Sequence, residues 1–263
     1  MMECSQSPVV SIVTVVFNGA TELRKTAESV ISLNYPHVEY IVIDGGSTDG
    51  SVDIIKSLGS KVSHFVSEPD KGIYDAMNKG IRAATGEWIN FMNCGDSFYS
   101  ANALDFFKQP IEAGTDIIYG DAMVKYNTFE GLAPTHPVAE LWKQMPFCHQ
   151  ATFVKASLMK SRGFDLHYRL SSDFNFFYQS FLAGARFQYV PEVVCHFDYT
   201  QGASVKNALL STQERKQIVL RAGFDWKKWL YYSIQIGYVR ASIIGKKLLG
   251  KRLSEWIIRN VKR

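Results

Sequence analysis

The chain is poor in cysteine, and its few cysteines are not arranged for structural chemistry. Its 263 residues include four cysteines, with no CxxC pair and no dense framework, which argues against a disulfide-stapled secreted domain. With no apparent signal peptide at the N-terminus, we expect reduced cytosolic thiols. Two Cys-His dipeptides, Cys148-His149 and Cys195-His196, suggest zinc. Adjacent side chains of a strand point to opposite faces, however, so we predict no zinc site.

Two familiar phosphate-binding motifs are also missing. The chain has no GxGxxG sequence and no Walker A sequence, which excludes the dinucleotide-binding and P-loop classes. One glycine-rich stretch, Gly45-Gly46-Ser47-Thr48-Asp49-Gly50, follows an apolar run but matches neither motif.

The chain lacks a strong net charge. The formal net charge is +4, and residues 226–263 contain ten Lys or Arg against one acid, Glu255. The preceding part is therefore slightly acidic, which argues against nucleic acid as a partner of the main domain. A hydrophobic content of 46% is ample for a core and excludes a disordered protein.

What the sequence does have is a regular alternation of strand and helix patterns. Apolar, β-branched runs predict strands at 9–17, 38–43, 62–66 and 87–92. Helical spacing separates them, so we predict an α/β fold with a mainly parallel, doubly wound sheet and helices on both faces. The pattern then loosens, with a strand at 117–121, a helix at 172–182 and a strand at 186–199.

Three acidic residues follow predicted strands. Asp44 and Asp70 come after the second and third strands, and Asp96 closes the segment Asn93-Cys94-Gly95-Asp96 after the fourth. Open α/β sheets bind ligands at the carboxyl ends of their strands. These carboxylates therefore predict a site for a phosphorylated, metal-bound ligand. The alternative for Asp44 is that it caps the following turn, as Asp commonly does.

The C-terminal segment, residues 225–263, differs in kind. Residues 229–239 are uncharged and aromatic, but Arg240 ends this run well short of the ~20 residues that a spanning helix needs. Beyond it, basic residues surround an apolar stripe on one helical face. The stripe consists of Leu249, Leu253, Trp256, Ile257 and Val261. We predict a basic amphipathic helix that lies on an anionic membrane surface. The alternative is a helix packed on the domain with solvated lysines.

Several ordered motifs resemble those of family-2 glycosyltransferases, most closely the colanic-acid and exopolysaccharide type of bacterial enzyme. The resemblance covers about residues 9 to 205 and is carried by these segments: Ser11 to Asn18, Ile43 to Ser51, Asp70 to Gly80, Asn93 to Asp96, Cys148-His149-Gln150, Ser171-Ser172-Asp173 and Gly202-Ala203-Ser204.

This resemblance implies a GT-A fold, a UDP- or GDP-sugar donor, a divalent metal (Mn²⁺ or Mg²⁺) and inversion at the anomeric carbon. It implies nucleotide binding by Asn18, Asp44, Asp70 and Asn78. It implies metal binding by Asp96, a general base at Asp173, and substrate or acceptor contacts at Asn93, His149, Gln150 and His196.

Three of these roles have alternatives in the sequence itself. Asp173 is also explained as an acidic residue in the first turn of a helix, where the helix dipole favours a negative charge. Asn93 departs from the family pattern, which has an acid at that position, and an amide adds no charge for a metal. His196 is equally well explained as a core histidine, although with Asp198 it is a candidate for a further metal or phosphate contact.

We therefore expect an inverting glycosyltransferase that acts on a lipid-linked acceptor in bacterial surface polysaccharide synthesis. Residues 1–224 would form its GT-A domain, with a nucleotide-sugar half at about 9–100 and an acceptor half at about 101–224. Residues 225–263 would hold it peripherally on the cytoplasmic face of the membrane. The alternatives are a sugar-nucleotide nucleotidyltransferase, whose glycine- and arginine-rich loop is missing here, and a non-catalytic, membrane-attached assembly factor that kept the fold.

Overall fold

The computed structural model describes residues 7–126, 129–133, 135–199, 202 and 206–261, with the side chains of the last helix described as far as residue 245. The chain divides into two compact units, residues 1–201 and 202–263. The predicted boundary at residue 224 falls inside the second unit.

The first unit is built on one sheet, which has nine strands in the described part of the chain. Their bounds are β1 Val10–Val16, β2 Val38–Asp44, β3 His64–Ser67, β4 Trp88–Phe91, β5 Ser97–Phe98, β6 Ile117–Lys125, β7 Glu130–Leu132, β8 Thr152–Lys155 and β9 Phe187–Asp198. The strand order is β3-β2-β1-β4-β8-β6-β9-β5, and β7 pairs with β6.

The sheet is parallel in its first half and mixed in its second. β3, β2, β1 and β4 are parallel neighbours, as the alternating sequence pattern predicted. Beyond β4, the strand β8 is antiparallel to both β4 and β6, whereas β6 and β9 are parallel. The prediction of a mainly parallel sheet therefore needs correction for residues after 96, where strand directions depend on long connections that local patterns do not encode.

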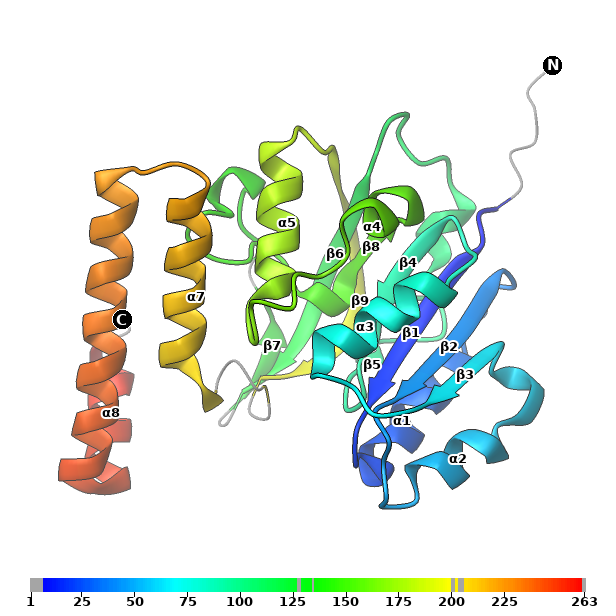
Figure 1. Cartoon of the computed structure of the whole chain (residues 1–263), viewed down its shortest axis with the longest axis horizontal. Coiled ribbons are helices and arrows are strands. Elements are labelled where there is room, and N and C mark those ends of the chain that lie inside the picture. The colour runs from blue at the N-terminus through cyan, green and yellow to red at the C-terminus, as the bar shows by residue number, and fades with distance from the viewer. Residues whose placement is uncertain (1–6, 127–128, 134, 200–201, 203–205, 262–263) are drawn as a thin grey trace. The chain divides into compact units, whose positions relative to one another are not determined.

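The helices of this unit are α1 Ala20–Ile31, α2 Ser51–Ser57, α3 Ile73–Ala83, α4 Ala156–Arg162 and α5 Ser172–Leu182. Short 3-10 turns are η1 Gly59–Lys61, η2 Asp105–Lys108, η3 Val138–Glu140 and η4 His149–Ala151. Helices α3, α4 and α5 lie over one face of the sheet and α1 over the other (Figure 1).

Both faces of β1 are covered, which explains why its sequence is apolar throughout. On one face of the sheet, Ile12 of β1 belongs to the main hydrophobic cluster together with Leu23 and Ala27 of α1. On the opposite face Gly80 of α3 lies so close to Val13 that a Cβ there would collide with the valine. This close packing fixes α3, and with it the loop that precedes α3.

The second unit contains α7 Ala208–Arg221 and α8 Trp226–Val261, which pack against each other. Lys216 of α7 donates to Ser233 Oγ at 2.8 Å and lies 4.9 Å from the ring centroid of Trp229. The apolar stripe predicted for residues 249 to 261 lies outside the residues whose side chains are described. Among the described residues, no helix is both long enough and apolar enough to span a membrane.

Candidate active site

The carboxyl ends of four parallel strands meet at one edge of the sheet. β1 ends just before Phe17 and Asn18, β2 ends at Asp44, and β4 ends two residues before Asn93. Because β1 lies between β2 and β4, the residues that follow these strands are neighbours. The loop from β3 to α3 adds Asp70 at the same edge.

Asp44 stabilises the turn that follows its strand. Its side chain is fully buried, and Oδ2 accepts hydrogen bonds from the backbone N–H groups of Gly46 and Ser47, both at 3.0 Å, and from Ser67 Oγ at 2.6 Å. Oδ1 is buried with no hydrogen-bond partner among the described residues. The turn-capping role is thus observed. Nucleotide binding by Asp44 stays a prediction, and Oδ1 is the oxygen that would make the contact.

Asn18 holds the same turn from the end of β1. Its backbone has a φ of 48°, and its Oδ1 accepts the N–H of Thr48 at 2.9 Å while its own N–H donates to Ser47 Oγ at 2.7 Å. Asn18 therefore shapes the glycine-rich loop beside Asp44.

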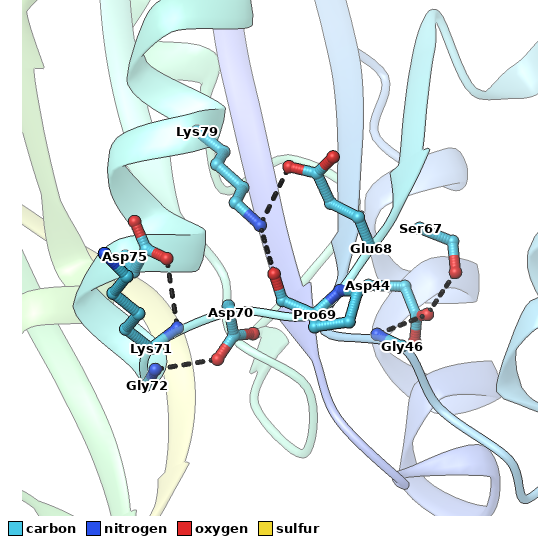
Figure 2. Close-up of polar contacts among 10 residues, drawn as sticks. All are labelled: Asp44, Gly46, Ser67, Glu68, Pro69, Asp70, Lys71, Gly72, Asp75 and Lys79. Carbon is cyan, nitrogen blue, oxygen red and sulfur yellow. Dashed lines mark hydrogen bonds and ion pairs between the residues drawn. The ribbon is translucent and has the colours of Figure 1, made fainter.

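Asp70 also lies against this loop. A Cβ at Gly45 would collide with Asp70 Oδ2, and Asp70 Oδ1 accepts the N–H of Gly72 at 2.8 Å. Figure 2 shows how Lys79 of α3 steadies the loop, donating to Pro69 O and pairing with Glu68, both at 2.9 Å. The structure thus brings Asn18, Asp44 and Asp70 together, as predicted from the sequence.

Phe17 is a further candidate site residue, which the sequence reasoning missed. Its side chain is 65% exposed although it directly follows a buried strand, and its ring lies 3.3 Å from the position that a Cβ on Gly45 would take. An exposed aromatic ring beside a polar loop is suited to stack on a flat ligand group. The available signal was an aromatic residue immediately before Asn18.

Asn78 is engaged elsewhere. Its Nδ2 donates to Phe164 O and its Oδ1 accepts the N–H of Phe164, both at 2.8 Å. Because both ends of its amide bond to the backbone of the same residue, Asn78 holds the segment before α5 in place. Its predicted nucleotide contact stays a prediction, and the contacts it makes are structural.

Asp96 is a buried carboxylate, 8% exposed. Gln150 Nε2 donates to its Oδ2 at 2.7 Å. Burial raises the pKa of Asp96 to about 7, with the nearby charge of Asp198 adding to the effect and hydrogen bonds from Gln150 and the backbone of Asp198 opposing it. A cation at this carboxylate would favour its charged form.

Asn93 offers a second oxygen in the same turn. The backbone N–H of Asp96 donates to Asn93 O at 3.0 Å, and Asn93 Oδ1 is buried with no hydrogen-bond partner among the described residues. A carboxylate and an orphaned amide oxygen are the hard ligands that Mg²⁺ and Mn²⁺ prefer, so these residues fit such a cation. Within the described ranges, no cluster of three or more His, Cys, Asp or Glu side chains is placed to hold a metal.

Asp173 lies at the start of α5 and faces His149. Its Oδ2 is 4.0 Å from His149 Nδ1, and its Oδ1 accepts hydrogen bonds from Tyr74 Oη and from the N–H of Phe174, both at 2.8 Å. The ring of His149 is close to those of Phe91, Phe164 and Phe177. Burial among these rings lowers the pKa of His149, although Asp173 opposes this effect.

The dipeptide His149-Gln150 connects the two carboxylates, because His149 faces Asp173 and Gln150 binds Asp96. Asn90, a buried residue of β4, anchors this turn by donating to Gln150 O at 2.9 Å and to Thr152 O at 2.8 Å. The signal for Asn90 was a polar residue within an apolar strand. The contact that Gln150 makes is with Asp96, and its predicted acceptor contact stays a prediction.

His196 is placed on β9, opposite Ser97 of β5. Its Nδ1 lies 3.0 Å from Glu130 Oε1, and its ring is 4.9 Å from that of Tyr99. It is therefore not a core histidine, and within the described ranges its polar partner is Glu130 rather than Asp96. The motif residues Ala203 and Ser204 lie outside the described part of the chain.

The arrangement of donor-side loop, buried acid and strand order is that of a GT-A-like α/β fold. The chain belongs to glycosyl transferase family 2, whose model matches residues 11–196. It is therefore a glycosyltransferase rather than a sugar-nucleotide nucleotidyltransferase or a non-catalytic assembly factor, the two alternatives raised by the sequence.

Two curated relatives illustrate the match. The chain is 30% identical over 176 residues to the PGL/p-HBAD biosynthesis glycosyltransferase of Mycobacterium bovis, covering 65% of this chain and 68% of the relative. It is 32% identical over 210 residues to an uncharacterised glycosyltransferase of Mycobacterium tuberculosis, covering 74% and 77%.

Solved structures agree on the fold. TarS residues 1–349 of S. aureus, in complex with UDP-GlcNAc, superimposes with a TM-score of 0.67 at 14% identity, covering 92% of this chain and 76% of that one. The mannosyltransferase PcManGT of Pyrobaculum calidifontis, in complex with GDP-Man and Mn²⁺, gives a TM-score of 0.66 at 14% identity, covering 98% and 80%.

Proposed function

We propose that this chain is an inverting glycosyltransferase that transfers a sugar from a nucleotide-diphospho-sugar to a hydroxyl of a lipid-linked glycan in bacterial surface polysaccharide synthesis. The exopolysaccharide type is the one its motifs resemble. The observation that carries the proposal is the link from Asp96 through Gln150 and His149 to Asp173. It puts a buried carboxylate suited to a cation and a carboxylate suited to a base on either side of one turn.

The donor nucleotide would occupy the edge lined by Asn18, Asp44 and Asp70, with its base on the exposed ring of Phe17. Asp44 Oδ1 is buried and has no hydrogen-bond partner in the described part of the chain, so it is the acceptor that a base N–H would use. Aromatic rings stack on bases irrespective of their identity. TarS is solved with UDP and UDP-GlcNAc and PcManGT with GDP-Man. These neighbours support a UDP- or GDP-sugar as donor.

Asp96 and Asn93 would hold a divalent cation, Mn²⁺ or Mg²⁺, through their side-chain oxygens. Such a cation supplies the positive charge that neutralises the leaving diphosphate as its bond to the sugar breaks. Since Asp96 and Asn93 provide few ligands, the donor's phosphates would complete the set. The presence of Mn²⁺ in the PcManGT structure supports this assignment.

Asp173 would act as the single base of a direct displacement. Its Oδ2 takes the proton of the acceptor hydroxyl while that oxygen bonds to the anomeric carbon and the diphosphate leaves with its bonding electrons. Burial lowers the pKa of His149, which favours the neutral imidazole over a permanent ion pair with Asp173. One displacement by one base inverts the anomeric configuration.

A panel of UDP- and GDP-sugars tests the function directly. We expect one nucleotide class to raise the melting temperature of the protein, and more so with Mn²⁺, because a ligand that binds only the native state stabilises it. With a lipid-linked saccharide as acceptor, NMR of the product should show inversion. A retained configuration, or no stabilisation by any donor with or without Mn²⁺, would contradict the proposal.

The second unit would place the enzyme peripherally on the cytoplasmic face of a membrane. Exposed apolar residues recur at four-residue spacing along α8, at Trp226, Leu230, Ile234 and Tyr238, and such residues follow one another along a helix face. Basic residues Lys227, Lys228 and Arg240 lie between and after them. Apolar rings with flanking cations suit an anionic bilayer surface, which would concentrate the enzyme with a lipid-linked acceptor.

Vesicle flotation tests this placement. The protein should float with vesicles containing phosphatidylglycerol and much less with pure phosphatidylcholine, and deletion of residues 226–263 should abolish flotation. Ile234→Glu should weaken it, whereas Leu182→Glu, at an exposed position of α5 in the first unit, serves as the matched control. Equal flotation of the deletion variant would refute the placement.

A further inference from the structure

Tyr74 connects two elements that are far apart in the sequence. It lies on α3, and its hydroxyl donates to Asp173 Oδ1 at 2.8 Å across 99 residues of chain. Its side chain is buried. A buried tyrosine needs a hydrogen-bond partner for its hydroxyl, and here that partner is the carboxylate proposed as the catalytic base.

The two oxygens of Asp173 have different surroundings. Oδ1 accepts from both Tyr74 and the backbone N–H of Phe174, and this pair of donors fixes the plane of the carboxylate. Oδ2 is the oxygen that faces His149, 4.0 Å away. The Asp173 side chain remains 25% exposed, so Oδ2 is the oxygen with which an incoming hydroxyl would bond.

The tyrosine hydroxyl is itself held firmly. The ring of Tyr74 contacts that of Phe164 at 5.4 Å between centroids, and Asn78 fixes the backbone of Phe164 by two hydrogen bonds. Burial, and then the charge of Asp173, raise the pKa of Tyr74 well above its usual value. The phenol therefore keeps its proton and remains a donor throughout the reaction.

Helix α3 also follows directly from the donor loop. Gly72 is its N-cap, and Asp70, only four residues before Tyr74, accepts the N–H of Gly72. Figure 2 shows this loop and the start of α3, with Lys71 donating its N–H to Asp75. The loop that would contact the donor and the hydroxyl that holds Asp173 therefore belong to one short, hydrogen-bonded segment.

We propose that Tyr74 is a positioning residue that fixes Asp173 so that Oδ2 points at the acceptor hydroxyl. This inference rests on the proposed role of Asp173 as the base. The proton moves from the acceptor oxygen to Asp173 Oδ2, and Tyr74 neither gains nor loses a proton. If Tyr74 only stabilised the core, removing its hydroxyl would change the free energy of unfolding and leave the rate of the chemical step unchanged.

The test compares Tyr74→Phe with Tyr40→Phe. Tyr40 is a matched control because it is also buried and its hydroxyl bonds across strands, to Thr14 Oγ1 at 3.2 Å. We expect Tyr74→Phe to lower kcat by about 10- to 100-fold, since small displacements of a reacting group have effects of this size. The KM values for donor and acceptor should stay within about twofold, because binding groups are intact. Tyr40→Phe should leave kcat unchanged.

A double-mutant cycle with Asp173→Asn separates this inference from the proposed function. In single-turnover assays, Tyr74→Phe should have little further effect once Asp173 is replaced, because the tyrosine acts through that carboxylate. A wild-type kcat for Tyr74→Phe, or the same loss of kcat in both backgrounds, would overturn the positioning role. Full activity of Asp173→Asn alone would instead overturn the base assignment.

Discussion

The proposed donor side and the proposed base side of the site are built by different kinds of contact. On the donor side, Asp44 and Asp70 bond to backbone N–H groups two or three residues ahead, at strand ends that the sheet already aligns. On the base side, Tyr74 reaches Asp173 across 99 residues and Asn78 reaches Phe164 across 86. Short turns and bonds between the ends of neighbouring strands, such as Asn18 with Thr48 and Asp44 with Ser67, position the donor loops. The proposed base depends instead on packing between distant segments. The base side should therefore respond more strongly to substitutions that only disturb packing.

Asn78→Ala sharpens this contrast most. It removes two hydrogen bonds and leaves the backbone N–H and C=O of Phe164 unpaired, so we expect unfolding to become easier by about 2–3 kcal/mol. Because Phe164 contacts both Tyr74 and His149, kcat should fall while the KM for the donor stays constant. Urea denaturation and steady-state kinetics measure both.

The control for Asn78→Ala is Asn102→Ala, which removes an exposed amide contact with Asn34 at 2.8 Å. It should change stability by well under about 1 kcal/mol. A raised donor KM for Asn78→Ala with unchanged stability would restore the nucleotide contact predicted from the sequence.

Phe17→Ala tests the donor side. Loss of a stacking ring should weaken donor binding by about tenfold, since stacking on a base contributes about 1–3 kcal/mol. Stability should hardly change, because the ring is 65% exposed. Isothermal titration with the donor identified in the panel measures the affinity. Phe224→Ala, at a 77% exposed ring of the second unit, should bind the donor normally, and equal affinity for both variants would remove Phe17 from the site.

Much of the donor side was predictable from the sequence, and little of the base side was. The runs before Asn18, Asp44 and Asp96 gave the parallel strands, and parallel strands place their ends together whatever the rest of the chain does. The nucleotide contact predicted for Asn78 rests on motif position alone. The bond from Asn78 to Phe164 spans 86 residues and depends on how α3 packs against the segment before α5. Tyr74 was overlooked for the same reason.

Asp96→Asn should change stability with an unusual sign. The folded-state pKa of about 7 lies above the ordinary value of 3.8, so between these values the native state binds a proton that the unfolded state does not. Stability from this group is full below about pH 4 and is lost as pH rises through 7. Without metal, Asp96→Asn should therefore be more stable than the wild type at pH 8, by up to about 4 kcal/mol, and equal to it near pH 4.

Urea midpoints at the two pH values measure this difference. A variant that is destabilised equally at both would show that Asp96 is not a strained, buried acid, and would weaken its assignment as a cation ligand.

The most direct test of the whole account compares donor binding with sugar transfer in Asp173→Asn and Asp96→Ala. We expect Asp173→Asn to bind the donor with Mn²⁺ as the wild type does and to transfer sugar at least about 10²-fold more slowly, because only the base is lost. Asp96→Ala should lose both Mn²⁺-dependent donor binding and transfer. Transfer by Asp173→Asn at the wild-type rate would contradict the central claim that Asp96 and Asp173 share one catalytic site with separate tasks.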